Sequence, residues 1–156
     1  MTSPIEVRLA ELGLVLPTPA APVAAYVPVV EAGGLLHVSG QLPFDEDGKL
    51  MTGRLEGPGD VDFGAAAARR CGIMLIAQIK AALGSLDRVE RIVKLGAFVT
   101  SGQAFFDQPK VANGASELMA AVFGAAGQHA RSAVGVPALP LGAVCEIDAV
   151  VAVRPA

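Results

Sequence analysis

Residues 131–153, RSAVGVPALPLGAVCEIDAVVAV, decide how the rest of this chain is interpreted. Apolar residues recur here with a period of two, which predicts a strand, a Pro/Gly turn and a second strand. One face of the first strand carries Ser132, Val134 and Val136, and the other carries Arg131, Ala133 and Gly135. One face of the second strand is entirely apolar: Cys145, Ile147, Ala149, Val151 and Val153. Its other face carries Glu146 and Asp148.

Arg131 and Glu146 share one side of the sheet if the apolar faces of both strands point the same way. That side is otherwise lined by alanine, glycine and valine, a surface too apolar to be left in water. A cation and a carboxylate on a face of small residues predict a site that something else covers. A second copy of the chain is one candidate for that cover.

The same stretch resembles the C-terminal signature of the reactive intermediate deaminases (RidA, also called YjgF or L-PSP endoribonuclease-like). The shared pattern is Arg-Ser-x-Val-x-Val, then Leu-Pro, then Glu-Ile-Asp. Two earlier segments also resemble the family: Ala-Tyr-Val at 25–27 and Ser-Gly-Gln-Leu-Pro at 39–43. Asn113 falls where the family carries an asparagine on its second helix. The resemblance covers about residues 24–153, with the motifs in the right order.

Composition favours an oligomer and argues against a nucleic-acid partner. At 156 residues the chain is expected to form a single domain. Hydrophobic residues make up 53% and charged residues only 17%, which leaves more apolar surface than a small monomer readily hides. Aromatic residues make up 4%, and the net charge is −3 with no run of Lys and Arg. The electrostatic footprint of a nucleic-acid-binding protein is therefore missing.

The sequence predicts neither a metal site nor a bound cofactor. The two histidines are isolated, and no cluster of Cys and His has the spacing of zinc ligands. Cys71 and Cys145 are expected to be buried free thiols, on a helix and on a core-facing strand position. No apolar run reaches the length of a membrane span, and the N-terminus lacks the order of a signal peptide. A cytoplasmic location and no membrane partner are expected.

The pattern along the chain predicts the element order β-β-α-β-α-β-β after a short N-terminal helix. Ser3 and Pro4 start that helix, which lies in a segment, residues 1–23, that we interpret as a packing extension of the single domain 1–156. A hairpin is expected around Ala32-Gly33-Gly34, between strands at 26–31 and 35–39.

The later elements are two helices that alternate with strands. A long helix should run from Asp62 to Leu83, followed by a charged connection at 87–91. Residues 92–100 are nearly all apolar, as in a central strand covered on both sides, and a second helix should begin at Asp107. This order predicts an α+β sandwich with both helices on one face of one mixed sheet. The resemblance implies the chorismate-mutase-like fold, in which three subunits pack their bare sheet faces around a central barrel.

Arg131 is the strongest candidate for a functional residue. Its guanidinium suits bidentate binding of a carboxylate and stays charged when partly buried. The resemblance implies that it holds the carboxylate of a 2-imino acid; the alternative is an ordinary surface ion pair. Glu146 could orient a water for attack on an imine carbon and pass a proton to ammonia, or could be a structural partner across a subunit boundary. His129 is interpreted as a loop-end residue, and no Ser-His-Asp arrangement is evident.

The remaining candidates come from the resemblance and are expected to bind the substrate. Ala133 stands where the family often has a cysteine, a position whose backbone carbonyl contacts the water. Tyr26 could close the pocket or fill an interface. Ser39 and Gly40 could contact the ligand or simply form a turn. Asn113 could bind the ligand or lie on plain solvated surface.

The leading hypothesis is a homotrimeric, metal-free deaminase that hydrolyses enamine and imine intermediates at sites between subunits. Its ligands would be small 2-imino and 2-oxo acids, and Ala133 indicates a divergent subgroup of the family. A second hypothesis is a non-catalytic module that senses a small carboxylate. A third hypothesis is the endoribonuclease activity of the family's older name. The net negative charge and the low aromatic content disfavour it.

Overall fold

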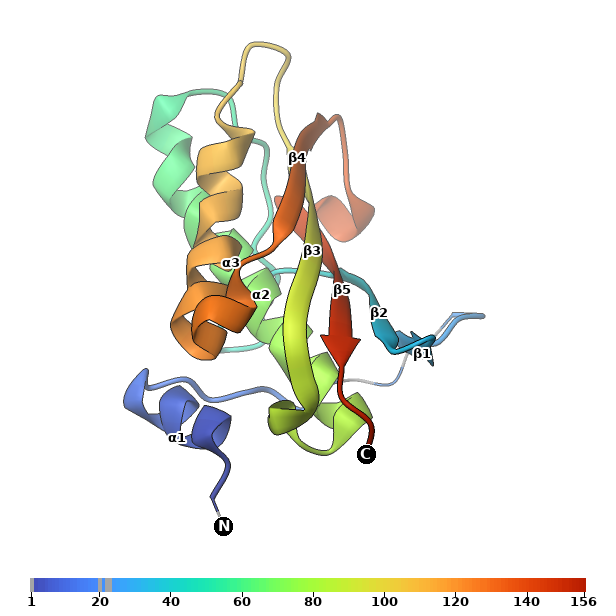
Figure 1. Ribbon diagram of the computed structural model, residues 1–156. Coiled ribbons are helices and arrows are strands. Elements are labelled where there is room, and N and C mark those ends of the chain that lie inside the picture. Colours follow the sequence, from blue (N-terminus) through green and yellow to red (C-terminus); the bar gives the residue numbers. More distant parts are fainter. Residues whose placement is uncertain (1, 20, 22–23) are drawn as a thin grey trace.

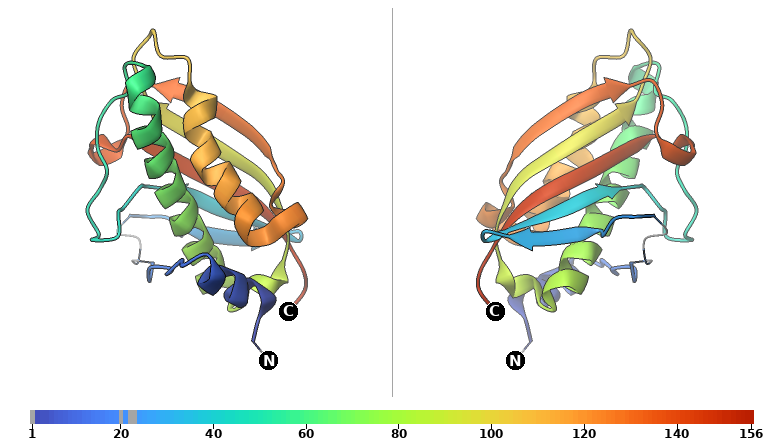
Figure 2. Two further views of the ribbon diagram at one scale, coloured as in Figure 1. Left: turned by 90° about the vertical axis from the view of Figure 1, so that its left-hand side faces the viewer. Right: turned by 90° about the vertical axis from the view of Figure 1, so that its right-hand side faces the viewer.

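Five strands form one mixed sheet in the order β1-β2-β5-β3-β4, and two long helices cover one of its faces (Figure 1, Figure 2). This computed structural model describes residues 2–19, 21 and 24–156. The strands are β1 (Val29–Ala32), β2 (Leu35–Gln41), β3 (Val89–Thr100), β4 (Ala130–Val136) and β5 (Cys145–Val153). The helices are α1 (Pro4–Glu11), α2 (Val61–Leu83) and α3 (Gln108–Phe123). The predicted element order and the α+β, chorismate-mutase-like class are confirmed.

The strand pairing follows from the connections between the strands. Gly33 and Gly34 link β1 to β2 with φ values of 60° and 79°, the left-handed backbone that a two-residue hairpin turn requires. β3 and β4 are parallel, whereas the other neighbours are antiparallel. A parallel pair needs a crossover, and α3 provides it. As a result β4 is an edge strand that lies against α3.

α2 and α3 pack closely because glycines lie at their contact. A methyl group on Gly114 of α3 would overlap the carbonyl oxygen of Ala65 on α2, and one on Gly72 would lie 2.8 Å from a methyl carbon of Leu118. Each helix buries a stripe of apolar residues that recur at helical spacing in the sequence: Cys71, Leu75, Ile76, Ile79, Leu83, Val111, Ala115, Leu118 and Val122. Among the described residues, no helix is both long and apolar enough to cross a bilayer.

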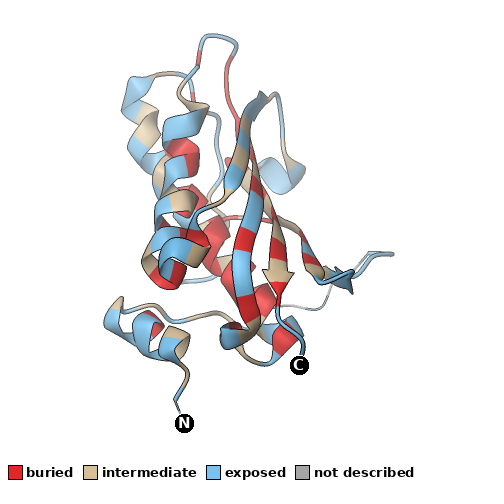
Figure 3. Cartoon of the chain, in the orientation of Figure 1, coloured by how far each residue is buried: buried red, intermediate tan, exposed pale blue. Residues whose placement is uncertain are grey.

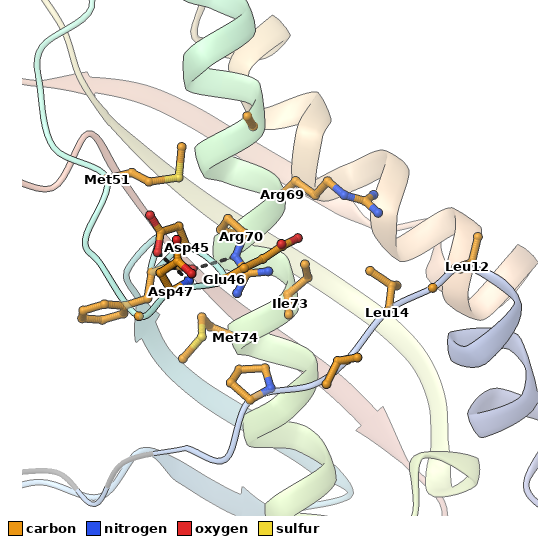
Figure 4. A pocket seen from close by; sticks show the side chains of 16 residues that line it. Leu12, Leu14, Asp45, Glu46, Asp47, Met51, Arg69, Arg70, Ile73 and Met74 are labelled. Atoms are coloured by element: carbon orange, nitrogen blue, oxygen red, sulfur yellow. Dashed lines mark hydrogen bonds between the residues drawn. The ribbon is translucent and has the colours of Figure 1, made fainter.

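The N-terminal segment covers the outer side of α2. Ser3 caps α1 by accepting the N–H of Glu6 at 3.3 Å, as predicted, and Glu6 pairs with Lys80 of α2 at 2.8 Å. Residues 12–17 then run beside Ile73 (Figure 4). Ile73 lies off the main apolar stripe of α2 but is still buried, because this segment and its leucines pack against the core.

β3 differs from the sequence expectation in two ways. It begins at Val89, which pairs with Val153 of β5, so the predicted charged connection at 87–91 is partly strand. The helices cover only one of its faces within the chain (Figure 2), so the expectation of cover on both sides is wrong for a single chain. Buried and more exposed residues alternate along it (Figure 3).

The sheet face turned away from the helices, called here the uncovered face, carries apolar side chains together with two carboxylates and two cations. The strand register places these residues on it: Val30, Leu35, His37, Arg91, Lys94, Phe98, Ser132, Val134, Glu146, Asp148, Val150 and Ala152. Val30 and Val134 are 49% and 45% exposed. An apolar sheet face of this kind favours contact with another protein surface.

Candidate functional site

The predicted site residues form two groups at different places on the sheet. The first group, called here the arginine group, lies where β4 meets α3 and comprises Asn113, Arg131 and Ala133. The second, called the glutamate group, lies around β2 and β5 and comprises Tyr26, Ser39, Gly40 and Glu146. The chain by itself does not bring the two groups together.

Arg131 and Glu146 lie on opposite faces of the sheet, which corrects the expectation that they share one. Arg131 pairs with Leu95 of β3, whose side chain is buried beneath the helices. Glu146 pairs with Phe98, which is three residues further along β3 and therefore points to the uncovered face. The error came from β4, because Val134 points to the uncovered face while the apolar side of β5 faces the helices.

The spacing between these two residues is also too large for one small ligand. β4 and β5 flank β3 on opposite sides, so their axes lie about 9.6 Å apart, and a three-residue offset adds roughly 10 Å along the strands. The Cα atoms of Arg131 and Glu146 are therefore roughly 14 Å apart. A short imino acid cannot touch both side chains of the same chain.

In the arginine group, three acceptors on α3 hold the guanidinium of Arg131. Nη1 donates to Asn113 Oδ1 at 2.9 Å and to Ser116 Oγ at 3.1 Å, and Nη2 donates to the Pro109 carbonyl at 3.2 Å. Ala133 lies on the same face, half-buried against the core. Asn113 is exposed, as the sequence indicated, but it contacts Arg131. Ser116 was missed, although its i+3 spacing from Asn113 places both on one side of the helix.

His129 extends the arginine group and is more than a loop-end residue. Its Nδ1 lies 2.7 Å from the carbonyl oxygen of Gly127, and its Nε2 lies 2.9 Å from Ser116 Oγ. A carbonyl can only accept, so in the neutral ring Nδ1 carries the hydrogen and Nε2 accepts from the serine hydroxyl. A Ser–His contact therefore exists that the sequence did not reveal, because Ser116 is in α3 and His129 precedes β4.

Three members of the glutamate group, Tyr26, Ser39 and Gly40, help to line a small cavity of about 170 Å³, which Glu146 does not line. Two buried amides extend this polar site: Gln41 Nε2 donates to the Ser39 carbonyl at 3.1 Å, and Gln78 Nε2 donates to Gln41 Oε1 at 3.4 Å. Gln41 follows Ser39 and Gly40 in the segment expected to form a turn or to contact the ligand, whereas nothing in the sequence pointed to Gln78 of α2.

Glu146 reaches this group by packing over Gly40. A methyl group at residue 40 would overlap the Glu146 carboxylate, with its Cδ only 2.8 Å away, so the glycine makes room for the acid. Partial burial, and secondly the charge of Asp148, raise the pKa of Glu146 above its ordinary value. Among the described residues, neither carboxylate forms an ion pair.

Both cysteines are buried, and the described residues include no set of side chains placed to ligate a metal. In the described part of the chain, no three His, Cys, Asp or Glu side chains gather closely enough to hold a metal ion. Cys71 and Cys145 are free and buried, as predicted, with sulfur atoms 3.6 Å apart. Burial raises the pKa of the Cys71 thiol well above its usual value, which makes that thiol a poor nucleophile.

A larger cavity, of about 850 Å³, shares Phe44 and Met74 with the smaller one (Figure 4). It opens between the segment after α1, the outer side of α2 and the acidic turn at 45–48. Its floor is apolar, with Leu14, Ile73 and Met74. Arg70 at its edge donates from Nε to the Phe44 carbonyl at 2.6 Å. No predicted site residue lines it.

Comparisons with known sequences agree with this fold and these motifs. A family described as "YjgF/chorismate_mutase-like, putative endoribonuclease" matches residues 6–152. Protein TCP17 of Trypanosoma cruzi is 51% identical over 148 residues, which make up 94% of this chain and 92% of that protein.

Solved structures give the same result. Atu1372 from Agrobacterium tumefaciens, a protein of unknown function, is 47% identical with a TM-score of 0.87, over 96% of this chain and 92% of its own. RidA from an Antarctic Psychrobacter is 30% identical with a TM-score of 0.61, over 87% of this chain and 94% of its own. The greater likeness to Atu1372 than to this RidA agrees with a divergent subgroup. The chain belongs to the RidA/YjgF family.

Proposed function

We propose that the protein hydrolyses reactive 2-imino acids and their enamine tautomers at sites that two subunits of a homotrimer complete. The observation that carries this proposal is the separation of the two groups within one chain. The arginine group can bind a carboxylate, and the glutamate group can accept and donate a proton. The Cα atoms of Arg131 and Glu146 are roughly 14 Å apart, however, and their side chains lie on opposite faces of the sheet. Because β4 is an edge strand, a neighbouring subunit can approach Arg131 at the rim of the sheet.

The uncovered face supports the trimer. Val30 and Val134 are nearly half exposed in the single chain, and charged residues make up only 17% of the sequence. Apolar faces of this kind are normally buried in subunit contacts. Packing the uncovered faces of three copies together would also carry each Glu146 into a boundary between subunits.

Arg131 and Glu146 then divide the chemistry of imine hydrolysis. Arg131 holds the substrate carboxylate, and the Glu146 carboxylate accepts a proton from water as the water oxygen bonds to the imine carbon. The C=N electron pair moves to nitrogen, which receives the proton from Glu146. The hydroxyl of the resulting carbinolamine next gives its proton to Glu146, which passes it to the nitrogen. The oxygen electron pair then forms the C=O bond as the C–N bond breaks, and ammonia leaves a 2-oxo acid behind. A raised pKa suits this exchange near neutral pH, and fixing substrate and water in place supplies much of the acceleration.

The other site residues have supporting roles in this proposal. The cavity beside Tyr26, Ser39 and Gly40 receives the substrate side chain. Asn113 acts on Arg131 and not on the ligand, because its side-chain oxygen already accepts from Nη1. Ala133 contributes its backbone carbonyl toward the water, a role that does not need the cysteine side chain often found there in the family.

Subunit complementation tests the proposal. Arg131→Ala should abolish substrate binding, and Glu146→Gln should lower the hydrolysis rate by roughly 100-fold. Trimers assembled from equal amounts of both variants would contain wild-type residues at about a quarter of their boundaries if each site draws on two subunits. Ammonia release from 2-iminobutanoate generated in situ should therefore recover to about a quarter of the wild-type rate.

Two outcomes would decide against this function. Mixed trimers as inactive as the parents would show that both residues act from one chain, or not at all. Tight binding of 2-oxobutanoate with no ammonia release by the wild-type protein would favour the carboxylate-sensing module. We do not propose RNA cleavage, because a net charge of −3 and a 4% aromatic content give little for RNA to bind.

A further inference from the structure

The structure assigns Ser116 and His129 to a positioning role: they turn Arg131 so that one edge of its guanidinium presents two donors to a carboxylate. This inference rests on the proposed function, in which Arg131 is the carboxylate anchor. Neither Ser116 nor His129 need touch the substrate. Both act through the hydrogen bonds that fix the arginine.

The direction of every hydrogen bond in this network is fixed by its two ends. Arg131 can only donate and the Gly127 carbonyl can only accept. The bonds therefore run from Arg131 Nη1 to Ser116 Oγ at 3.1 Å, from the Ser116 hydroxyl to His129 Nε2 at 2.9 Å, and from His129 Nδ1 to the Gly127 oxygen at 2.7 Å. Bonds aligned in one direction polarise one another, so each strengthens the next.

The end of the network is held firmly by packing. Gly127 closes the 3₁₀ helix Gly124–Gly127 and is buried, and a methyl group there would overlap the carbonyl group of Met119 in α3. Ser116 and His129 are themselves half-buried. The acceptor that orients the imidazole therefore has little freedom to move, and this constraint passes to Ser116 and Arg131.

The network leaves one edge of the guanidinium for a ligand. An arginine carries five N–H donors. The two on Nη1 are used by Asn113 and Ser116, and one on Nη2 is used by the Pro109 carbonyl. No described residue accepts from Nε of Arg131. The Nε hydrogen and one Nη2 hydrogen remain, and these are the two donors that the positioning role offers to the oxygens of a carboxylate.

Titration calorimetry with two probes tests the role: 2-oxobutanoate, and 2-oxobutanamide, which lacks the second carboxylate oxygen. Ser116→Ala should weaken 2-oxobutanoate binding by about 5- to 10-fold, the effect of one lost hydrogen bond. It should change 2-oxobutanamide binding by less than about 2-fold, because the amide cannot use the fork. In turnover, KM should rise while kcat stays within about 2-fold, since Ser116 does not contact the reacting atoms.

Conservative variants separate positioning from a general packing effect. Ser116→Thr keeps the hydroxyl and should restore binding, and His129→Gln should bind better than His129→Phe, because the glutamine oxygen can still accept from Ser116. Ser132→Ala is the matched control: it deletes a hydroxyl next to Arg131, on the opposite face of β4. All variants are compared as trimers with a wild-type melting temperature.

The outcomes distinguish this inference from the proposed function. If Arg131→Ala abolishes carboxylate binding while Ser116→Ala and His129→Phe bind like the wild type, the positioning role is overturned and the proposed function stands. A Ser116→Thr variant that binds no better than Ser116→Ala would also overturn it. If the wild-type protein binds no 2-oxo acid, the anchor role of Arg131 and this inference both fail.

Discussion

The arginine group is complete within one chain, whereas the glutamate group is open. Arg131 is held by three acceptors on α3, and Ser116 and His129 hold one another. Glu146 stands beside Asp148 on the uncovered face, and no described residue forms an ion pair with either carboxylate. The arginine group can therefore form in a monomer. The glutamate group instead leaves a carboxylate without an ion-pair partner.

This difference shows which half of the site a partner must complete. A preorganised cation binds a carboxylate with little further ordering, so the arginine group needs no rearrangement to act. An acid with a raised pKa and no partner is typical of a functional site, and it costs the folded chain stability that an assembly can offset. We therefore expect changes in the arginine group to alter ligand binding and changes around Glu146 to alter turnover.

Breaking the arginine group at Arg131 should have the largest effect. Arg131→Ala should cost about 2–4 kcal/mol of binding free energy for 2-oxobutanoate, the scale of a charge left without its partner. Arg131→Lys should fail as well, because an ammonium is a point charge that cannot replace the planar fork. Titration calorimetry measures both, with Arg69→Ala on the outer side of α2 as the control. An Arg131→Lys variant with wild-type affinity would contradict the two-pronged contact.

Crowding the glutamate group at Gly40 should have the next largest effect. Alanine suits the backbone there, but its methyl group would overlap the Glu146 carboxylate and push that flexible side chain aside. A displacement near 1 Å at a reacting group lowers rates by up to about 100-fold, so we expect Gly40→Ala to lose about 10- to 100-fold in kcat while keeping its affinity for 2-oxobutanoate. Initial-rate kinetics at saturating substrate test this.

Gly59→Ala is the matched control for Gly40→Ala. An added methyl group at residue 59 meets no atom within 4 Å, so its kcat should equal that of the wild type. A Gly40→Ala enzyme with full turnover would show that the present position of Glu146 does not matter to the reaction.

Local patterns in the sequence predicted most of the fold because each pattern has a local cause. Gly33 and Gly34 form the hairpin turn, because glycine readily adopts the left-handed backbone conformation that the turn requires. The apolar stripes of α2 and α3 are buried as their spacing indicated. The faces of β4 were assigned wrongly because alternation shows that a strand has two faces but not which one the helices cover. The apolar Val134 points away from the helices.

Within the candidate site, the family motif pointed to Arg131, Glu146 and Asn113, and their roles stay predictions. It did not point to Ser116 and His129, because their contact depends on how α3 lies against β4, which no sequence spacing fixes. Gln78 was missed for the same reason: it meets Gln41 across α2 and β2. Contacts between separate elements need the tertiary structure, even when each element is correctly predicted.

The smallest expected effect concerns Glu146 itself. Partial burial first, and Asp148 second, raise the pKa of Glu146 above its ordinary value of 4.5. The folded chain then holds this proton more tightly than the unfolded chain. Its contribution to stability is fully present below the unfolded pKa of about 4.5 and declines as the pH rises through the folded pKa.

Glu146→Gln has no carboxyl to titrate and therefore does not show this decline. The stability of the variant minus that of the wild type should be larger at about pH 7 than at about pH 4. The gain should be less than about 1 kcal/mol, because the side chain is only partly buried and solvent screens its charge. Urea unfolding at the two pH values measures the difference, and Glu117→Gln on the exposed side of α3 corrects for the loss of one surface charge. A gain that is equal at both pH values, or larger in acid, would mean that Glu146 is compensated in the folded protein. The contrast with the arginine group would then disappear.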